Sequence, residues 1–325
     1  MSDGVRQLRF SVVVPTYNRP ERLRRCVSAL AAMEYPRDRF EVVIVDDGSP
    51  QPAEPVVQQA AAEAGEGFQV RLVRQANAGP AAARNRGAAE ATGEVLAFTD
   101  DDCEPAADWL TRLDVRIGDN PALMVGGRLV NALPDDLFAE ASQQITEFVY
   151  DWAERLGHGT GPDDAYVFAT ANLACGREAF CAVGGFDETF PLAAGEDHDF
   201  SHKYQFAGHP AAFDGSAVVH HWHAMSLREF CRQHVAYGRG LLHFIRRVSL
   251  RSDNARHRLP GSFQARLAWY GLRRCRRPRD VAVFALVQLS QAATLLGALK
   301  EARDRPAGKA LAAASSSSGG GTCVS

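Results

Sequence analysis

Residues 94–102 read EVLAFTDDD, a short apolar segment followed by the aspartates Asp100, Asp101 and Asp102. Carboxylates this close repel one another, and nothing nearby in the sequence neutralises them. A divalent cation would do so, because oxygen-rich clusters suit Mg²⁺ or Mn²⁺ and leave positions open for substrate phosphates. The alternative is a solvated acidic turn before a helix, since Pro105 and Asp108 are typical of a helix start. The triplet alone leaves both interpretations open.

The first hundred residues alternate between strand-like and helix-like patterns. They predict strands at 9–14, 40–45, 68–73 and 94–99, and helices at 21–33, 52–64 and 80–91. Strands that alternate with helices of this length indicate βαβ units and a parallel sheet. The strands are almost continuously apolar, which indicates burial on both faces. The predicted fold class is therefore α/β.

Polar residues follow three of these strands. The first ends in Thr16-Tyr17-Asn18, the second in Asp46-Asp47-Gly48-Ser49 and the fourth in the aspartates. Ligands of open α/β sheets bind beyond the carboxyl ends of the strands, so we expect these residues to converge on one crevice. A purely structural role is the alternative, because Asp, Gly and Ser are also turn residues. Neither GxGxxG nor GxxxxGK[ST] occurs, which counts against a Rossmann dinucleotide site and a P-loop.

Charge is divided unevenly along the chain. The formal net charge is −3, but residues 1–224 carry 18 basic and 34 acidic side chains, a net of −16, whereas residues 225–310 carry 18 and 5, a net of +13. This asymmetry favours a basic face that meets an anionic partner, such as a membrane surface or a phosphorylated lipid. We expect no nucleic-acid partner.

The C-terminal third is predicted to be helical. A basic helix is expected at 226–250 and an apolar one at 281–299. The second would be about 28 Å long, close to the thickness of a bilayer core. A polar stripe of Gln288, Gln291 and Thr294 nevertheless favours a helix that packs on the domain or lies in the membrane interface over a spanning helix. Peripheral membrane contact through this basic region is therefore expected.

The cysteines and the N-terminal sequence indicate the cellular compartment of the protein. The seven cysteines are scattered and form no CxxC pair, a pattern typical of free thiols in a reducing compartment. No apolar signal-peptide core precedes the first strand. We therefore expect a cytoplasmic protein, at the inner face of the cell membrane where the basic region binds lipid.

Several ordered motifs between residues 9 and about 240 resemble those of the family 2 glycosyltransferases. They are VPTYN at 14–18, VDDGS at 45–49, NAGPAAARNRG at 77–87, FTDDD at 98–102, GGFD at 184–187, GED at 195–197 and the pair His220-His221. Each motif alone is weak, but together they occur in the order of the family. The resemblance implies the GT-A fold, a Rossmann-like and mostly parallel central sheet flanked by helices, here with a helical basic C-terminal extension.

The resemblance also implies a division of the chain. Residues 1–240 would form the glycosyltransferase domain, with a nucleotide-sugar-binding half at 1–105 and an acceptor and catalytic half at 106–240. Residues 241–310 would be the basic helical region. The Ala/Ser/Gly-rich residues 311–325 would be a disordered tail.

Roles for individual residues follow from the same resemblance. Asp197 would be the catalytic base, and Asp102 with His220 would hold Mn²⁺ or Mg²⁺, with the adjacent His221 as the alternative ligand. Glu196 and Trp222 would lie on the acceptor side. The nucleotide sugar would be bound by Pro15, Thr16, Tyr17, Asn18, Asp47, Asn77, Gly79, Arg84, Asp100 and Asp101.

The implied activity is metal-dependent, inverting transfer of a sugar from a UDP-, GDP- or dTDP-sugar to a hydroxyl acceptor. Such chemistry needs a cation at the diphosphate leaving group and a base for the hydroxyl. The basic C-terminal third favours a lipid-linked or anionic acceptor, in cell-envelope glycan, glycolipid or secondary-metabolite synthesis. The glycines at 157–165 suggest a lid over the substrate. The alternatives are a nucleotidyltransferase-like enzyme and a non-catalytic module that binds a nucleotide sugar.

Overall fold

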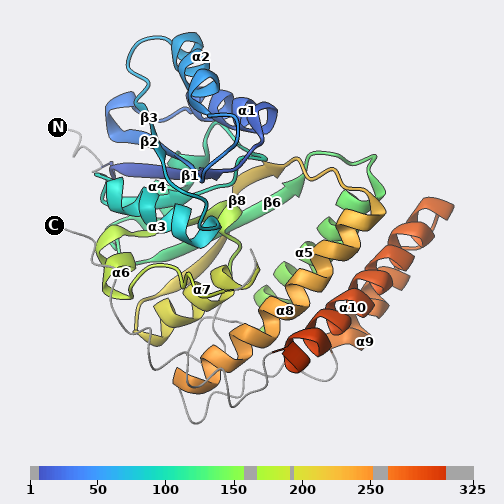
Figure 1. The fold of residues 1–325 in the computed structure, drawn as a ribbon. Coiled ribbons are helices and arrows are strands. Elements are labelled where there is room, and N and C mark those ends of the chain that lie inside the picture. The colour runs from blue at the N-terminus through green and yellow to red at the C-terminus, as the bar shows by residue number, and fades with distance from the viewer. Residues whose placement is uncertain (1–6, 157–166, 191–193, 252–262, 305–325) are drawn as a thin grey trace.

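The computed structural model describes residues 7–156, 167–190, 194–251 and 263–304. At its centre lies an eight-stranded sheet in the order β3-β2-β1-β4-β7-β6-β8-β5. Helices flank the sheet, and long C-terminal helices lie together at one side (Figure 1). The predicted lid at 157–165 and the predicted tail at 311–325 lie outside the described residues.

The first half confirms the predicted alternation. The strands β1 (Phe10–Thr16), β2 (Phe40–Asp46), β3 (Val70–Arg74) and β4 (Val95–Phe98) pair in parallel. Between them come α1 (Pro20–Ala31), the short η1 (Arg37–Arg39), α2 (Glu54–Ala64) and α3 (Pro80–Glu90). Both faces of β1 are buried: Val12 packs in the core with α1 and α2, and Val13 packs in the core with α3. Burial on both faces explains why these strands are apolar at nearly every position.

The second half makes the sheet mixed. Its elements are β5 (Cys103–Pro105), α4 (Trp109–Ile117), β6 (Met124–Asn131), α5 (Leu137–Leu156), η3 (Thr170–Asn172), β7 (Leu173–Gly176), α6 (Arg177–Ala182), α7 (Glu196–Phe206) and β8 (Ala211–His221). β7 runs antiparallel to β4 and β6, and β5 runs antiparallel to β8, whereas β6 and β8 are parallel. The β5–β8 register places His221 opposite Cys103, next to the three aspartates.

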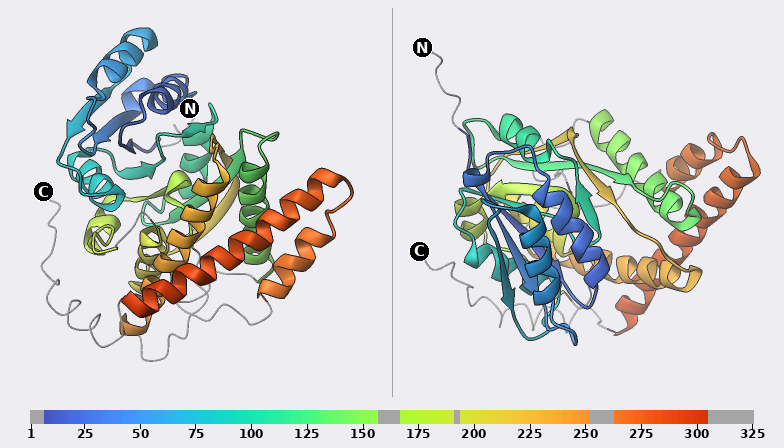
Figure 2. Two further views of the ribbon diagram at one scale, coloured as in Figure 1. Left: turned by 45° about the vertical axis from the view of Figure 1, so that its right-hand side comes forward. Right: turned by 90° about the horizontal axis from the view of Figure 1, so that it is seen from above.

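Three helices complete the described chain, namely α8 (Leu227–Arg251), α9 (Phe263–Leu272) and α10 (Pro278–Asp304). α10 runs along α8 (Figure 2). The two backbones approach closely at two glycines: a Cβ on Gly238 would lie 1.8 Å from the carbonyl oxygen of Thr294, and one on Gly297 would lie 2.0 Å from that of Val235. α8 continues through residue 240, so the boundary predicted there is not a break in the structure.

The cysteines agree only in part with the expectation of free thiols. Cys26, Cys103, Cys175, Cys231 and Cys275 are free. Cys181 is disulfide-bonded, so the expectation is wrong at that position.

Candidate active site

Asp102 is the centre of a cluster built from two distant segments. Its buried carboxylate follows β4, and the histidines that approach it come from the end of β8. Asp102 Oδ1 lies 3.4 Å from Nε2 of His221, and Asp102 Oδ2 lies 3.9 Å from Nδ1 of His223. The two imidazole rings stack with centroids 4.6 Å apart. One ligand atom from each of the three residues lies within 4.8 Å of the others, a spacing that suits one shared cation.

The structure does not bring His220 to this cluster. His220 is exposed and lies opposite Glu104 in the β5–β8 ladder. Successive side chains of a strand point to opposite faces, so His220 and His221 cannot both face Asp102. The structure therefore brings to Asp102 the alternative ligand His221, together with His223, instead of His220; metal binding by these residues stays a prediction.

The Nδ1 atom of His223 provides the best test of whether the site can hold a metal. Gln233 Nε2 donates to the Tyr237 hydroxyl at 2.6 Å, so Gln233 Oε1 faces His223 Nε2, at 3.0 Å. Nε2 then carries a proton, and a neutral ring would present the lone pair of Nδ1 to Asp102. This Nδ1 is buried and has no hydrogen-bond partner. A divalent cation would satisfy that lone pair, so the residues present fit a metal.

Two arginines at the start of α1 also reach the carboxylate of Asp102. Arg22 Nη1 lies 2.9 Å from Oδ2, and Arg19 Nη1 lies 3.5 Å from the same oxygen. Burial alone would raise the pKa of Asp102, but the neighbouring imidazoles of His221 and His223 hold it well below its usual range. Asp102 is therefore ionised at neutral pH, as a metal ligand must be.

Asp101 faces the interior instead of solvent. Its carboxylate accepts hydrogen bonds from the hydroxyl of Thr16 at 2.8 Å and from Arg19 at 3.1 Å. Burial raises the pKa of Asp101 to about 6. These bonds join the end of β1 to the aspartate triplet, so the predicted convergence of the two strand ends is confirmed here.

Asp100 belongs to a second group of charges around Arg84. The buried guanidinium of Arg84, on α3, lies 2.7 Å from Asp100, which follows β4, and 3.2 Å from Glu196, the first residue of α7. Burial lowers the pKa of Arg84, but Asp100, Glu196 and Asp197 raise it more. Glu196 is buried, one of its carboxylate oxygens has no hydrogen-bond partner, and burial raises its pKa to about 7.

Asp197 lies half-buried in the first turn of α7, two residues after Gly195, whose φ is 90°. Acidic residues are favoured at a helix N-terminus, and this position is also compatible with a role in the site. Partial burial raises the pKa of Tyr237 on α8, and the charges of Asp197, Glu196, Asp102 and Asp100 raise it further. The charges of all four carboxylates therefore act on the Tyr237 hydroxyl.

The other expected donor-binding residues lie where β1 and β2 end. Tyr17 and Asn18 are exposed, and Pro15 is half-buried. Asn18 adopts a left-handed backbone conformation, with φ of 54°, and its N–H donates to Ser49 Oγ at 2.8 Å. That bond holds the two strand ends together.

Asp47 fixes the neighbouring loop. Its carboxylate accepts hydrogen bonds from Gln75 and from the backbone N–H groups of Ala78 and Gly79, all at 2.8–2.9 Å, and its carbonyl oxygen accepts from Asn77 at 2.9 Å. Asp47 therefore shapes the wall of the crevice. Direct contact with a nucleotide by Asp47, Asn77 or Gly79 stays a prediction.

Trp222 packs against α1, and its expected role on the acceptor side stays a prediction. The guanidinium of Arg25, on α1, lies over its ring at 4.5 Å from the centroid. Its backbone N–H donates to the carbonyl oxygen of Asp102 at 2.9 Å. Trp222 therefore ties the chain after β8 to α1 and to Asp102.

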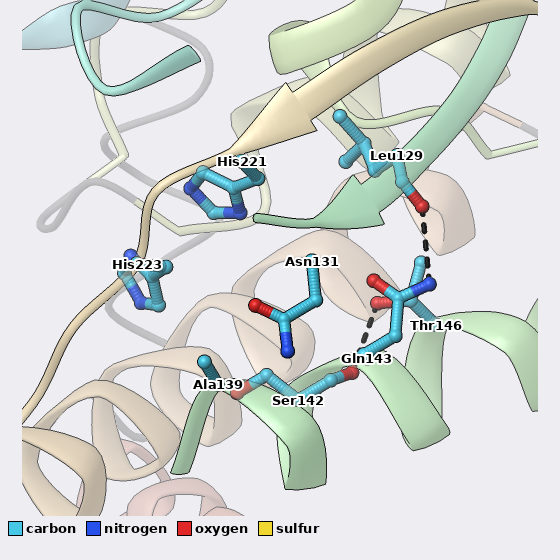
Figure 3. A pocket seen from close by; sticks show the side chains of 8 residues that line it. All are labelled: Leu129, Asn131, Ala139, Ser142, Gln143, Thr146, His221 and His223. Atoms are coloured by element: carbon cyan, nitrogen blue, oxygen red, sulfur yellow. Dashed lines mark hydrogen bonds between the residues drawn. The ribbon is translucent and has the colours of Figure 1, made fainter. Parts of the chain in front are cut away.

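A small pocket opens beside the two histidines. Figure 3 shows His221 and His223 at one end of it, with β6 and α5 forming the walls. Its cavity volume is about 30 Å³, and the lining is Leu129, Asn131, Ala139, Ser142, Gln143, Thr146, His221 and His223. Apart from the histidines the polar lining is uncharged amides and hydroxyls, which suits a hydroxyl-bearing group.

Residues 11–180 match the sequence model of glycosyl transferase family 2, which is more than half of the chain. The chain belongs to glycosyltransferase family 2. Glycosyltransferase AglE of Haloferax volcanii is 27% identical over 243 residues, or 74% of this chain and 76% of the relative. The pre-mycofactocin glycosyltransferase of Mycobacterium tuberculosis is 31% identical over 232 residues, covering 70% of this chain but only 46% of that longer protein.

Solved structures share the fold. A mannosyltransferase from Pyrobaculum calidifontis, PcManGT in complex with GDP-Man and Mn²⁺, superposes with a TM-score of 0.58 at 23% identity, over 95% of this chain and 80% of that one. Staphylococcus aureus TarS 1-349 in complex with UDP-GlcNAc gives 0.51 at 16% identity, over 91% and 92%. The GT-A fold predicted from the sequence is confirmed, and the protein is a glycosyltransferase.

Sequence reasoning missed five residues of this site, namely Arg19, Arg22, His223, Gln233 and Tyr237. Arg19 and Arg22 could have been predicted, because they begin the helix that follows the end of the first strand. Gln233 and Tyr237 are one helical turn apart on a helix that was predicted, but no sequence signal indicated which face of it meets the crevice.

Proposed function

We propose that this enzyme transfers a sugar from a nucleoside-diphosphate donor to a hydroxyl acceptor, with inversion at the anomeric carbon and with Mn²⁺ as cofactor. The observation that carries the proposal is the convergence of Asp102, His221 and His223 around a buried, unpartnered imidazole nitrogen. Two imidazoles favour Mn²⁺ over Mg²⁺, because Mg²⁺ demands oxygen ligands and keeps several waters.

The donor half of the site holds and polarises the leaving group. When bound, the cation supplies positive charge where the diphosphate departs. Arg19 and Arg22, which now neutralise Asp102, are free to turn to the phosphates once that carboxylate is shared with a cation. Both reach the site from the first turns of α1, where the helix dipole also favours anions.

On the acceptor side, Asp197 accepts the proton of the attacking hydroxyl. Arg84 links Glu196 to Asp100 and so fixes the start of α7 against the donor crevice. A hydroxyl that approaches between α7 and the histidines would attack the anomeric carbon on the face opposite to the diphosphate, which gives inversion. The neutral lining of the pocket beside His221 and His223 supports an acceptor rich in hydroxyl groups.

Relatives leave the sugar and acceptor open. One is a glucosyl-dolichyl phosphate glucuronosyltransferase of Haloferax volcanii and another a validoxylamine A glucosyltransferase of Streptomyces hygroscopicus, so donors and acceptors vary within similar sequences. A lipid-linked or anionic acceptor, and a cytoplasmic location, stay predictions for this chain.

A release assay tests the proposal and separates it from its alternatives. The protein is incubated with UDP-, GDP- and dTDP-sugars, with and without Mn²⁺, and the products are analysed. Release of nucleoside diphosphate that depends on Mn²⁺ and is lost in Asp102→Asn is expected. Pyrophosphate release from a nucleoside triphosphate would indicate a nucleotidyltransferase, and ligand binding without any release would indicate a binding module.

A further inference from the structure

The C-terminal helices α9 and α10 carry an exposed apolar surface. Thirteen large hydrophobic side chains are exposed among the described residues, and seven of them lie on these two helices: Trp269, Leu272, Val281, Leu289, Leu295, Leu296 and Leu299. We call these seven residues the apolar face. Single exposed apolar side chains are ordinary, whereas a concentration of them marks an interaction surface.

α10 has two apolar sides with different environments. Val283 and Val287 are buried in a core shared with α5, α8 and α9. The exposed side chains from Val281 to Leu299 are spaced 8, 6, 1 and 3 residues apart. At about 100° per residue they lie within about 120° of the helix circumference, so they form one stripe on the side that is not packed on the domain. Packing in the domain therefore accounts for one side of α10 and leaves the other without a partner among the described residues.

α10 is long and apolar enough to cross a membrane, with a mean hydropathy of 1.7 over its most apolar window. Two contacts tie it to α8 instead. Glu301 is fully buried and lies 3.0 Å from Arg239, and the backbones meet at Gly238 and Gly297. Removal of α10 from the domain would leave Arg239 without its buried partner, which is strongly unfavourable. α10 therefore stays packed and presents its outer stripe.

A cluster of cations adjoins the apolar face. Arg273, Arg274, Arg276, Arg277 and Arg279 connect α9 to α10 and are all exposed. None of these five arginines forms an ion pair with another described residue. They lie at the turn of the α9–α10 hairpin, which projects from the rest of the domain (Figure 2).

We propose that the α9–α10 hairpin docks this enzyme, as a peripheral protein, on an anionic membrane surface. The apolar face enters the boundary between headgroups and acyl chains, and the five arginines contact lipid phosphates. Charge selects this partner over a second copy of the chain. A symmetric dimer that pairs the arginine ends of the two patches would bring the clusters close together, and one that pairs opposite ends would leave both clusters without the anionic partner that a lipid surface supplies.

The surface adjoins the active site. α5 forms a wall of the pocket beside His221 and His223, and α8 carries Gln233 and Tyr237; both helices pack against α10. A docked enzyme would hold its acceptor side near the lipid, which suits a lipid-linked acceptor. Only the fit to a lipid-linked acceptor rests on the proposed function; docking on the membrane does not.

Vesicle co-sedimentation of the full chain tests the proposal. Wild-type protein should bind phosphatidylcholine vesicles that contain phosphatidylglycerol, and should bind pure phosphatidylcholine far more weakly. The triple variant Arg273→Gln, Arg276→Gln, Arg277→Gln should bind on the order of 100-fold more weakly, at about fivefold per arginine. The double variant Leu295→Gln, Leu299→Gln should also lose binding, because both side chains point away from the packed side.

Matched control variants test whether binding depends on the α9–α10 hairpin or only on the net charge of the protein. The triple variant Arg24→Gln, Arg39→Gln, Arg86→Gln changes the net charge equally, and Val115→Gln replaces an exposed apolar side chain on α4. Both should bind anionic vesicles like the wild type. The emission of Trp269, isolated by comparison with Trp269→Phe, should shift to shorter wavelength on binding.

Four results would overturn the proposal. The first is that the wild type does not bind anionic vesicles, and the second is that the control and hairpin triple variants lose binding equally. The third is membrane association that survives high salt and alkaline washing, as that of a spanning helix would. The fourth is a dimer in sedimentation analysis that Leu295→Gln, Leu299→Gln abolishes, while the protein does not bind vesicles. The last would assign the apolar face to a second copy of the chain.

Discussion

Replacement of Gln233 by leucine should weaken Mn²⁺ binding without unfolding the protein. Gln233 is half-buried on α8 and accepts from His223 Nε2 at 3.0 Å, while its own amide donates to Tyr237 at 2.6 Å. This pair of bonds fixes which nitrogen of His223 carries the proton. Leucine has a similar size but cannot accept a hydrogen bond, so His223 could rotate or carry its proton on Nδ1, the nitrogen that faces Asp102.

The magnitude follows from the single hydrogen bond that is lost. Outer partners of a metal-bound histidine are typically worth about 10–100-fold in metal affinity. That range corresponds to about 1.4–2.7 kcal/mol. One of the three proposed protein ligands is affected, while Asp102 and His221 keep their positions, so we expect the weakening to fall within this range and binding to survive.

The assay is a Mn²⁺ titration followed by electron paramagnetic resonance of the free ion, with and without nucleoside diphosphate. Gln233→Glu keeps the acceptor oxygen and should retain most of the affinity, whereas Gln58→Leu makes the same change on exposed α2 and should have no effect. If Gln233→Leu is folded and binds Mn²⁺ within twofold of the wild type, His223 is not a ligand held in this way.

Three further changes have defined outcomes. Asp197→Asn should lower transfer about 10²–10⁴-fold while donor binding persists, and unchanged turnover would remove Asp197 as the base. Because burial raises the pKa of Glu196 from 4.5 to about 7, the folded state keeps a proton that the unfolded chain releases, and stability should fall as pH rises from about 5 to 7. Glu196→Gln should flatten that slope in melting-temperature measurements, and an unaltered slope would assign it to other groups. Gly238→Ala should destabilise the protein by about 1–3 kcal/mol or more in denaturant unfolding, because its Cβ would lie 1.8 Å from the Thr294 carbonyl oxygen; wild-type stability would mean that α8 and α10 are not packed so closely.

The sequence was sufficient to predict the fold of the first half of the chain, because its pattern is local. Apolar strands that alternate with helices specify parallel order, and parallel order brings the carboxyl ends of the strands together. The Thr16–Asp101 hydrogen bond realises that expectation across 85 residues of chain. The boundaries of β4 and α3 moved by only a residue from the predicted ranges.

The proposed metal ligands could not be predicted fully, because they depend on strand pairing between segments that are distant in the sequence. Which of His220 and His221 faces Asp102 is decided by the register of β8 against β5, and a one-residue shift would exchange them. The pairing of β8 with β6 also shifts register between Gly127 and Arg128, and no local sequence motif predicts this shift. The roles of His223, Gln233 and Tyr237 likewise depend on how α8 is rotated against the sheet.

The most direct measurement is anomalous diffraction at the manganese absorption edge from crystals of the protein grown with Mn²⁺ and a nucleoside diphosphate. The account predicts one anomalous peak within about 2.0–2.4 Å of an Asp102 oxygen and of at least one nitrogen from His221 or His223, with the diphosphate on its open side. A well-bound nucleotide with manganese bound elsewhere, and with Asp102 still paired only to Arg19 and Arg22, would contradict it.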